Sequence, residues 1–474
     1  MQPSPGKGRG LKVRDAQAAV PRGILTTQMV GKRRRPLVGS GIGQLAIGFG
    51  LILLVGTLLL STPIASEERS WVNLKDALFT AVSAICVTGL TVVDTPTHWS
   101  AFGEAVILVL IQIGGLGYMV GTTVVMWALG RRIGIRDRNM LRLYYGAPSM
   151  HETFSFARGV AVFTFISEAL GAVVLWGAFR AEGESSGTAA WWGIFHSVSA
   201  FNNAGFSLTG RDVTPYTGNP IILGTLIVLI VLGGIGFIPV VTVMRRRSFG
   251  RLPLDNKLIL ATTAVLLISG AVFTAADEWN NDRTLGSLDP IERPLVALFQ
   301  STSARTAGFS AIDMSGMHDQ TKLATVGLMF VGAAAGSTGG GLKVGAFALL
   351  FAVMVATVRG SEEVSAFRRR IPAAVIQQAT TLALYHVALL FGFAFALTMT
   401  VERPFIDLVF EAQSAISTVG LSTTGTVSLG STAHFVLIVA MLAGRFSPVM
   451  LVLYMNRPRR KVAYHHPVDS VRLS

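Results

Sequence analysis

The stretch FTAVSAICVTGL, Phe79–Leu90, decides the fold, because its pattern returns three more times in the chain. The other copies read FHSVSAFNNAGF at Phe195–Phe206, FQSTSARTAGF at Phe299–Phe309 and FEAQSAISTVGL at Phe410–Leu421. From phenylalanine to glycine the offsets are 10, 10, 9 and 10 residues, and the glycines lie 116, 103 and 112 residues apart. Chance does not align four such frames, so the chain consists of repeats of roughly 110 residues.

The composition is that of a polytopic membrane protein. The 474 residues are 51% hydrophobic and only 14% charged, which is too apolar for a soluble protein. The net charge of +14 does not indicate a nucleic-acid partner, because the basic residues lie between apolar segments rather than on one face of a soluble domain. The single cysteine, Cys86, excludes an intramolecular disulfide.

Eight apolar segments are long enough to cross a hydrocarbon layer of roughly 30 Å. They cover about 42–62, 105–129, 156–179, 220–244, 258–276, 323–357, 375–400 and 433–455. Basic clusters lie at 32–35, 131–142, 245–251, 368–370 and 457–461, always before an odd-numbered segment or after an even-numbered one. The positive-inside rule therefore predicts both termini in the cytoplasm of a multi-pass protein of the cell membrane. The basic residues 1–36 lack a signal peptide and are expected to form a mobile cytoplasmic tail.

Each repeated frame lies in an outer connection and is expected to be a short re-entrant helix. The expected start of such a helix is clearest at Asp289-Pro290-Ile-Glu292, with Asp289 as N-cap. From Pro290 to Ser303 a helix is about 21 Å long, too short to span the bilayer. We therefore expect an all-α fold with eight spans and four re-entrant helices, arranged as four helix, pore helix, filter loop and helix repeats around one pore. The predicted divisions are a tail at 1–36, repeats at 37–142, 143–257, 258–370 and 371–456, and a cytoplasmic tail at 457–474.

Four glycine loops converging on one axis would present backbone carbonyls to a dehydrating cation. Irregular backbone at membrane depth is tolerated where it lines water, and glycine lets the carbonyls approach the axis. A single membrane glycine more often serves close helix packing, but four in register favour a filter. The predicted filter residues are Val87, Thr88, Gly89, Asn203, Ala204, Gly205, Thr306, Ala307, Gly308, Thr418, Val419 and Gly420.

On these four loops the chain resembles the Trk/Ktr/HKT superfamily of potassium transporters, over about residues 40–455. The resemblance implies potassium passage through one pore in a single chain, and Gly89 argues against the sodium selectivity seen where serine fills the first filter position. The absence of two extra N-terminal helices makes the chain look like the Ktr branch. That branch implies a homodimer, a cytoplasmic nucleotide-binding regulatory subunit and sodium as an activator, with potassium as substrate and no covalently bound cofactor.

The sixth apolar segment contains the run Gly332-Ala-Ala-Ala-Gly336-Ser337-Thr338-Gly339-Gly340-Gly341-Leu-Lys343, which is too rich in glycine to stay helical. We expect it to unwind, and the resemblance implies that this loop is the gate. It is not a nucleotide-binding loop, because Lys343 does not follow a glycine and Val344 follows it. The glycines at 115, 117 and 121 and at 233, 234 and 236 are interpreted as packing residues.

Charged residues within apolar segments are functional or paired by default. Arg445 is expected to raise an electrostatic barrier to cations and to anchor the closed gate loop, the alternative being a structural pair with Glu411 or Glu168. Lys343 is expected to position the gate loop and Arg305 to brace the third filter loop, while Glu168 and His386 are interpreted as hydrogen-bonded core residues.

Two other functions stay open. One is the potassium-binding subunit of an ATP-driven pump, which also has four filter loops. The other is a polytopic membrane enzyme, although the apolar segments hold no catalytic motif and no group of metal ligands.

Overall fold

The computed structural model describes residues 41–128, 153–361 and 363–455, which are almost entirely helical. The predicted tails at 1–36 and 457–474 and the basic cluster at 131–142 lie outside the described residues.

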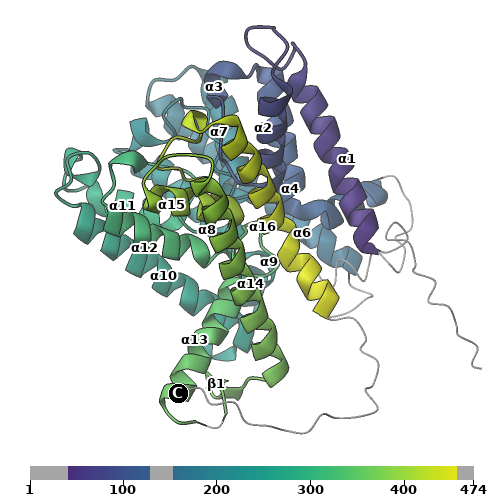
Figure 1. The fold of residues 1–474 in the computed structure, drawn as a ribbon, viewed down its shortest axis with the longest axis vertical. Helices are drawn as coiled ribbons and strands as arrows, with labels where there is room; N and C mark the ends of the chain where they lie inside the picture. Colours follow the sequence, from purple (N-terminus) through teal and green to yellow (C-terminus); the bar gives the residue numbers. More distant parts are fainter. Residues whose placement is uncertain (1–40, 129–152, 362, 456–474) are drawn as a thin grey trace, which may run out of the picture.

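Four units follow one another along the chain, each with a long helix, a short helix that ends in a loop, and a further helix (Figure 1). The first unit contains α1 (Gly41–Ser61), α2 (Leu74–Cys86), the single turn α3 (Thr95–His98) and α4 (Ala101–Ala128). The second contains α6 (Thr153–Ala181), α7 (Ser186–Phe201), α8 (Pro220–Ile235) and α9 (Phe237–Arg246). The third contains α10 (Leu254–Glu278), α11 (Arg293–Ser303), α12 (Asp319–Phe330) and α13 (Val344–Val358), and the fourth α14 (Ala373–Thr398), α15 (Phe405–Ile416) and α16 (Ser431–Met455).

The strands of the described chain form one small hairpin. Strands β1 (Ser365–Ala366) and β2 (Arg369–Arg370) pair antiparallel between α13 and α14. Figure 1 shows α13 and α14 running side by side to this hairpin at the bottom of the view. The hairpin therefore marks one end of the molecule, and it carries part of the basic cluster at 368–370.

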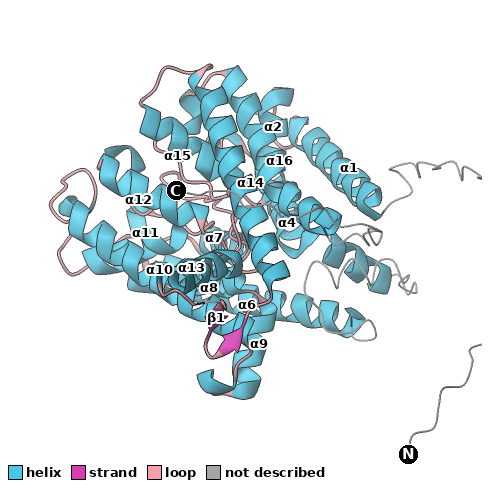
Figure 2. Ribbon diagram, turned by 60° about the horizontal axis from the view of Figure 1, so that its bottom comes forward, coloured by secondary structure: helices cyan, strands magenta, loops and turns pink. Residues whose placement is uncertain are grey.

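The units close into a ring. The helix that follows each loop packs on the short helix of the next unit: α4 on α7, α8 on α11, α12 on α15, and α16 on α2. Because the last contact joins the fourth unit to the first, the four loops are directed toward a common centre. Figure 2 shows loop segments gathered in the middle of the surrounding helices.

The phenylalanine of each repeated frame anchors its short helix in the core. Phe79, Phe195, Phe299 and Phe410 are all 0% exposed. Burying a phenylalanine side chain contributes about 1.5–3 kcal/mol. The outward faces of the long helices carry exposed apolar side chains, among them Leu170 and Val173 on α6, Val265 on α10 and Phe391 on α14. Such apolar faces are suited to lipid.

Length and hydropathy alone identify three helices of the described chain that can cross a membrane, Ala157–Ala181, Leu254–Glu278 and Ala373–Thr398. A fourth span arises if α8 and α9, bent by 97°, are counted together. Shorter apolar helices cover Ile47–Ser61, Ala101–Gly117, Val344–Val358 and Ser431–Arg445. Helices thus lie at all eight expected places, while the number that cross the membrane stays a prediction, as do the boundaries of the repeats.

The structure corrects the expected start of the third short helix. It begins at Arg293, and Glu292 rather than Asp289 stands at its N-cap, without a side-chain cap. Residues 289–292 form a turn instead, in which the Asp289 carbonyl accepts from the Glu292 N–H at 2.9 Å. The helix is therefore 11 residues long, about 16 Å, which still cannot span a bilayer. Side-chain caps occur at the first two short helices, from Asn73 and Ser185.

Two predicted packing glycines are helix breaks. Gly117 has φ 74° within α4, and Gly236 has φ 83° between α8 and α9. Both need the left-handed region that glycine enters without steric cost, so the apolar segments at 105–129 and 220–244 are not continuous helices. Gly115 and Gly233 do pack closely, since a Cβ would lie 1.9 Å from Asn202 Oδ1 and 1.8 Å from the Phe201 carbonyl oxygen, respectively. The surroundings of Gly121 lie outside the described side chains.

Candidate functional site

The four predicted filter glycines meet in a ring. All have positive φ: 93° at Gly89, 69° at Gly205, 81° at Gly308 and 104° at Gly420. A Cβ on each would strike the carbonyl oxygen of the residue before the next unit's glycine, at 2.5 Å from Ala204, 2.8 Å from Ala307, 2.2 Å from Val419 and 2.2 Å from Thr88, in that order. The contacts run from each unit to the next and return to the first, so the four loops surround one axis and leave no room for a side chain at any glycine.

The residue two places before each glycine also has a left-handed backbone. Val87, Asn203, Thr306 and Thr418 have φ of 58°, 59°, 74° and 50°. This conformation is unfavourable for a β-branched residue, and such strain clusters at functional sites. Hydrogen bonds hold it in place: the N–H groups of Thr88, Ala204 and Val419 each donate at 2.8 Å to the carbonyl of the serine five residues earlier, and the Gly308 N–H does so at 3.3 Å.

That serine also holds its loop through the hydroxyl. Ser83 Oγ accepts from the Gly89 N–H and Ser414 Oγ from the Gly420 N–H, each at 3.1 Å. Ser199 Oγ accepts from the Phe206 N–H at 3.0 Å, and Ser303 Oγ donates to the Phe309 carbonyl. No role for these serines was predicted from the sequence. Their fixed place in all four frames was the available signal.

A second set of positions whose role the sequence did not reveal is the residue after the frame phenylalanine in the second, third and fourth units. Glu411 accepts from the hydroxyls of Ser422 and Thr424, in the segment that leaves the fourth loop. His196 Nε2 lies 3.0 Å from Ser207 Oγ in the second unit. These side chains support the outgoing segments from behind, and Glu411 therefore does not pair with Arg445.

Outside the ring, Asp212 joins two units. Its carboxylate accepts from the Ser310 N–H, in the segment that follows the third loop. Burial raises the pKa of Asp212 from its usual 3.8 to about 8, and the hydrogen bonds from the Ser310 and Val213 N–H groups oppose that rise.

The predicted gate loop is non-helical and lies against one side of the ring. Helix α12 ends at Phe330 and α13 begins at Val344, which confirms that the sixth apolar segment unwinds. A Cβ on Gly339 would lie 2.2 Å from Thr306 Oγ1, and one on Gly340 would lie 2.2 Å from Thr418 Oγ1. The two glycines therefore pack directly against the first filter residues of the third and fourth units.

Other hydrogen bonds tie the same loop to the second unit. The Ala334 N–H donates to the Gly234 carbonyl at 2.9 Å, and Thr338 Oγ1 donates to the Phe201 carbonyl at 3.2 Å. The loop thus contacts three of the four units beneath the ring.

Three cationic side chains bind carbonyl oxygens at this level. Arg445 donates from Nη1 to the Thr338 carbonyl and from Nη2 to the Gly114 carbonyl, both at 2.8 Å. Lys343 Nζ donates to the Gly339 carbonyl at 2.7 Å. Arg305 Nη2 donates to the Gly332 carbonyl at 3.0 Å, so this side chain reaches the gate loop as well as standing beside its own filter loop.

The alternative pairing of Arg445 with Glu411 or Glu168 is wrong. Glu168 Oε1 accepts from Asn202 Nδ2 at 2.8 Å. His386 Nε2 lies 3.2 Å from Gln413 Nε2 and 3.3 Å from Ser417 Oγ. Both residues make core hydrogen bonds, as their interpretation predicted.

Three hydroxyls of the filter loops have no hydrogen-bond partner among the described residues. They belong to Thr88, Thr306 and Thr418, and all three oxygens are buried. Buried polar atoms are almost always paired, so these three oxygens are exceptions within the described part of the chain.

Together, the ring of glycine loops, its short helices and its apolar outer surface indicate a helical membrane protein. The family model TrkH, described as "Cation transport protein", matches residues 54–462. The chain belongs to this family of multi-pass membrane transporters, and it is not an enzyme.

Several characterised relatives are similar over most of their length. The Ktr system potassium uptake protein B of Bacillus subtilis is 37% identical over 86% of this chain and 91% of its own. The protein of the same name from Vibrio alginolyticus is 34% identical, over 89% and 92%. The potassium/sodium uptake protein NtpJ of Enterococcus hirae is 33% identical, over 92% and 97%.

The fold has a solved counterpart. The crystal structure of the potassium transporter TrkH from Vibrio parahaemolyticus superposes with a TM-score of 0.64, covering 90% of this chain and 88% of that chain at 20% identity. This likeness supports the helical architecture.

Proposed function

We propose that the chain takes up potassium ions across the cell membrane through the centre of the glycine ring. The ring of mutual contacts among the four filter glycines carries this proposal. With no side chain at these positions, the carbonyls of residues 87–89, 203–205, 306–308 and 418–420 can replace the hydration shell of a cation. The unpaired hydroxyls of the threonines in these loops offer further oxygen ligands.

In this proposal the loop 332–343 is the gate, and the structure represents its closed position. Gly336, Ser337, Thr338, Gly339, Gly340 and Gly341 block the inner end of the path, and Lys343 and Arg445 hold the loop through its carbonyls. A guanidinium at membrane depth also repels cations. Opening requires the hydrogen bonds of Arg445 to Thr338 and of Thr338 to Phe201 to break, after which the loop can leave the axis.

The similarity to Ktr system proteins supports a wider assembly. We propose a homodimer in the lipid bilayer, with both termini in the cytoplasm and a cytoplasmic nucleotide-binding subunit that controls the gate. We also propose sodium as an activator; the Enterococcus hirae relative is named a potassium/sodium uptake protein, which supports the involvement of sodium. The TrkH match favours this function over the pump subunit.

Potassium flux into liposomes tests the proposal. Purified wild type should pass potassium down its gradient, Gly89→Ser should lower the ratio of potassium to sodium flux, and deletion of Ser337–Gly341 should raise the flux. Gly327→Ala is a matched control, because a Cβ at Gly327 meets nothing within 4 Å. Folded protein that passes no cation in any of these forms would refute the pore.

A further inference from the structure

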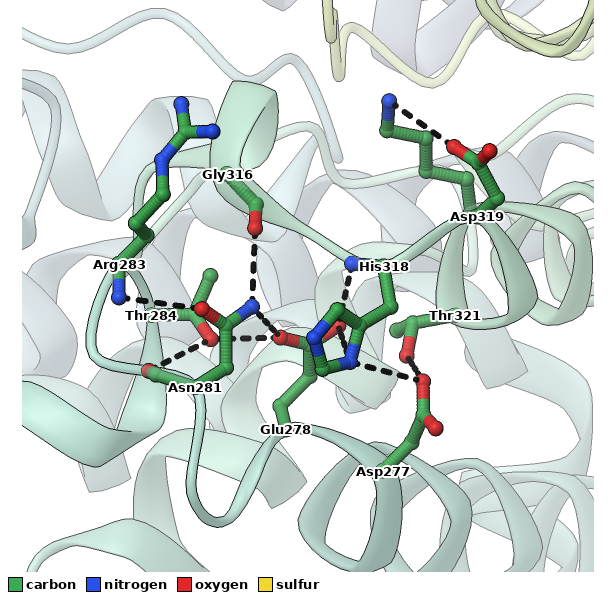
Figure 3. A network of polar contacts seen from close by, with 10 residues as sticks. Asp277, Glu278, Asn281, Arg283, Thr284, Gly316, His318, Asp319 and Thr321 are labelled. Carbon is green, nitrogen blue, oxygen red and sulfur yellow. Dashed lines mark hydrogen bonds and ion pairs between the residues drawn. The ribbon is translucent and has the colours of Figure 1, made fainter.

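Three side chains of the kind that bind metals meet where α10 ends and α12 begins (Figure 3). They are Asp277, Glu278 and His318, and one ligand atom from each lies within 4.8 Å of the others. Neither the filter nor the gate uses them. They belong to two chain segments that flank the third filter loop.

The His318 ring stands beyond hydrogen-bond distance of both carboxylates, while the His318 backbone N–H donates to Glu278 Oε1 at 2.9 Å. His318 Nδ1 lies 3.5 Å from Asp277 Oδ2 and 3.9 Å from Glu278 Oε1. Both distances exceed those of ordinary hydrogen bonds. Ligands with bonds of about 2.0–2.2 Å to a tetrahedral zinc ion lie about 3.3–3.6 Å apart, which is close to the first of these separations.

The charges around the group also call for a cation. The Glu278 side chain is 0% exposed and that of Asp277 is 28% exposed. Among the described residues, the ion-pair contacts of both carboxylates go to His318, and neither acid pairs with a lysine or arginine. Two neighbouring carboxylates, one of them buried, repel each other unless a positive charge lies between or beside them.

Hydrogen bonds from behind fix both carboxylates, as is typical of metal ligands. Glu278 Oε2 accepts from Asn281 Nδ2 and from the Thr284 hydroxyl, each at 2.6 Å. Asp277 Oδ2 accepts from the Thr321 hydroxyl at 2.5 Å. Figure 3 shows the His318 ring facing the two acids, and its side chain is 49% exposed. The exposed ring gives an ion a route from water.

We propose that Asp277, Glu278 and His318 bind a divalent transition-metal ion, with Zn²⁺ the best match and water as the fourth ligand. One imidazole and two carboxylates are ligands that zinc accepts. The ion links the end of α10 to the start of α12 and thereby stabilises the third unit. In the proposed topology it binds from the outside of the cell.

Isothermal titration of the full-length chain in detergent with zinc chloride tests this site, after chelator treatment and removal of any affinity tag. Because His465 and His466 in the C-terminal tail are adjacent, all proteins should carry alanine at both positions. We expect one zinc ion per chain and a zinc-dependent rise in the thermal midpoint, since a ligand of the folded state stabilises it. His318→Ala and Asp277→Asn should each weaken binding at least tenfold, and His318→Cys should restore part of the affinity.

Asp319→Asn is the matched control. Asp319 neighbours His318 but forms its ion pair with Lys322, so this variant should bind zinc like the wild type. Absence of zinc binding by folded protein, or wild-type affinity in both His318→Ala and Asp277→Asn, would show that the three residues form only a histidine and carboxylate pairing. Because binding is measured without flux, this outcome leaves the proposed pore untouched, and failure of the flux assay leaves the zinc site untouched.

Discussion

Replacement of Gly340 by alanine should open the gate. The added Cβ would lie 2.2 Å from Thr418 Oγ1 and 2.4 Å from the Ser417 carbonyl oxygen, more than 1 Å inside an ordinary contact of about 3.5 Å. Overpacking of this kind costs about 1–3 kcal/mol. If the whole cost falls on the closed loop, the ratio of open to closed molecules rises by about 5–150-fold.

The assay is potassium flux into liposomes without any regulatory subunit, with the potassium to sodium flux ratio measured in parallel. A rise in flux at unchanged ratio means that the loop has moved away from an intact filter. A rise in flux together with a lower potassium to sodium ratio means that the filter loop has moved instead of the gate loop. This result would refute the assignment of the strain to the gate loop. Flux equal to that of the wild type and of Gly327→Ala, in folded protein, would refute the reasoning altogether.

Further predictions concern three charged positions. Arg445→Gln removes the guanidinium bonded to the Thr338 carbonyl and should raise potassium flux in the same liposomes, whereas unchanged flux would contradict a role in holding the loop. Asp407→Asn removes the buried carboxylate 2.8 Å from the buried Lys322 and leaves this lysine only the exposed Asp319 at 3.5 Å, and should cost about 3–5 kcal/mol; thermal unfolding measures the loss, and a double variant with Lys322→Met should recover part of it. Burial raises the pKa of Asp212 to about 8, so between about pH 4 and pH 8 the folded protein keeps a proton on this carboxyl group that the unfolded chain has lost. The wild type should therefore lose stability as pH rises from about 4 to about 8. Asp212→Asn should lack that part of the pH dependence in a series of melting curves.

The sequence could predict the ring because the filter depends on local pattern. Each loop needs a short helix, a serine four residues after the frame phenylalanine and a glycine five or six residues beyond that serine, and all three occur in every frame. The unwound sixth segment was equally visible, since a run of glycines cannot hold a helix. These features depend on backbone freedom and spacing, which a sequence displays directly.

Partners across units were not predictable in the same way. Arg445 could have paired with a carboxylate. Glu168 and Glu411, however, already accept hydrogen bonds from neighbouring side chains. The Arg445 guanidinium donates to the Thr338 and Gly114 carbonyls instead. The helix breaks at Gly117 and Gly236 were missed because a glycine that packs and a glycine that bends look alike in a sequence. The start of α11 was missed because Asp289-Pro290 begins a turn as readily as a helix.

The four repeated units can be compared with one another, and this comparison distinguishes features of the predicted filter from features of the predicted gate. Features shared by all four units, the positive φ of the glycines and the supporting serines, are the ones that we assign to the proposed filter. Features confined to one unit are the ones that we assign to regulation. The arginine before the filter loop is one such feature, since Arg305 stands where the other units have Cys86, Asn202 and Ser417. Arg305 donates to Gly332 at one end of the broken segment, and Arg445 donates to Thr338 within it. Arg305 and Arg445 therefore both bind the loop 332–343. Because they share this target, we assign the regulation of flux, rather than the choice of ion, to the third and fourth units.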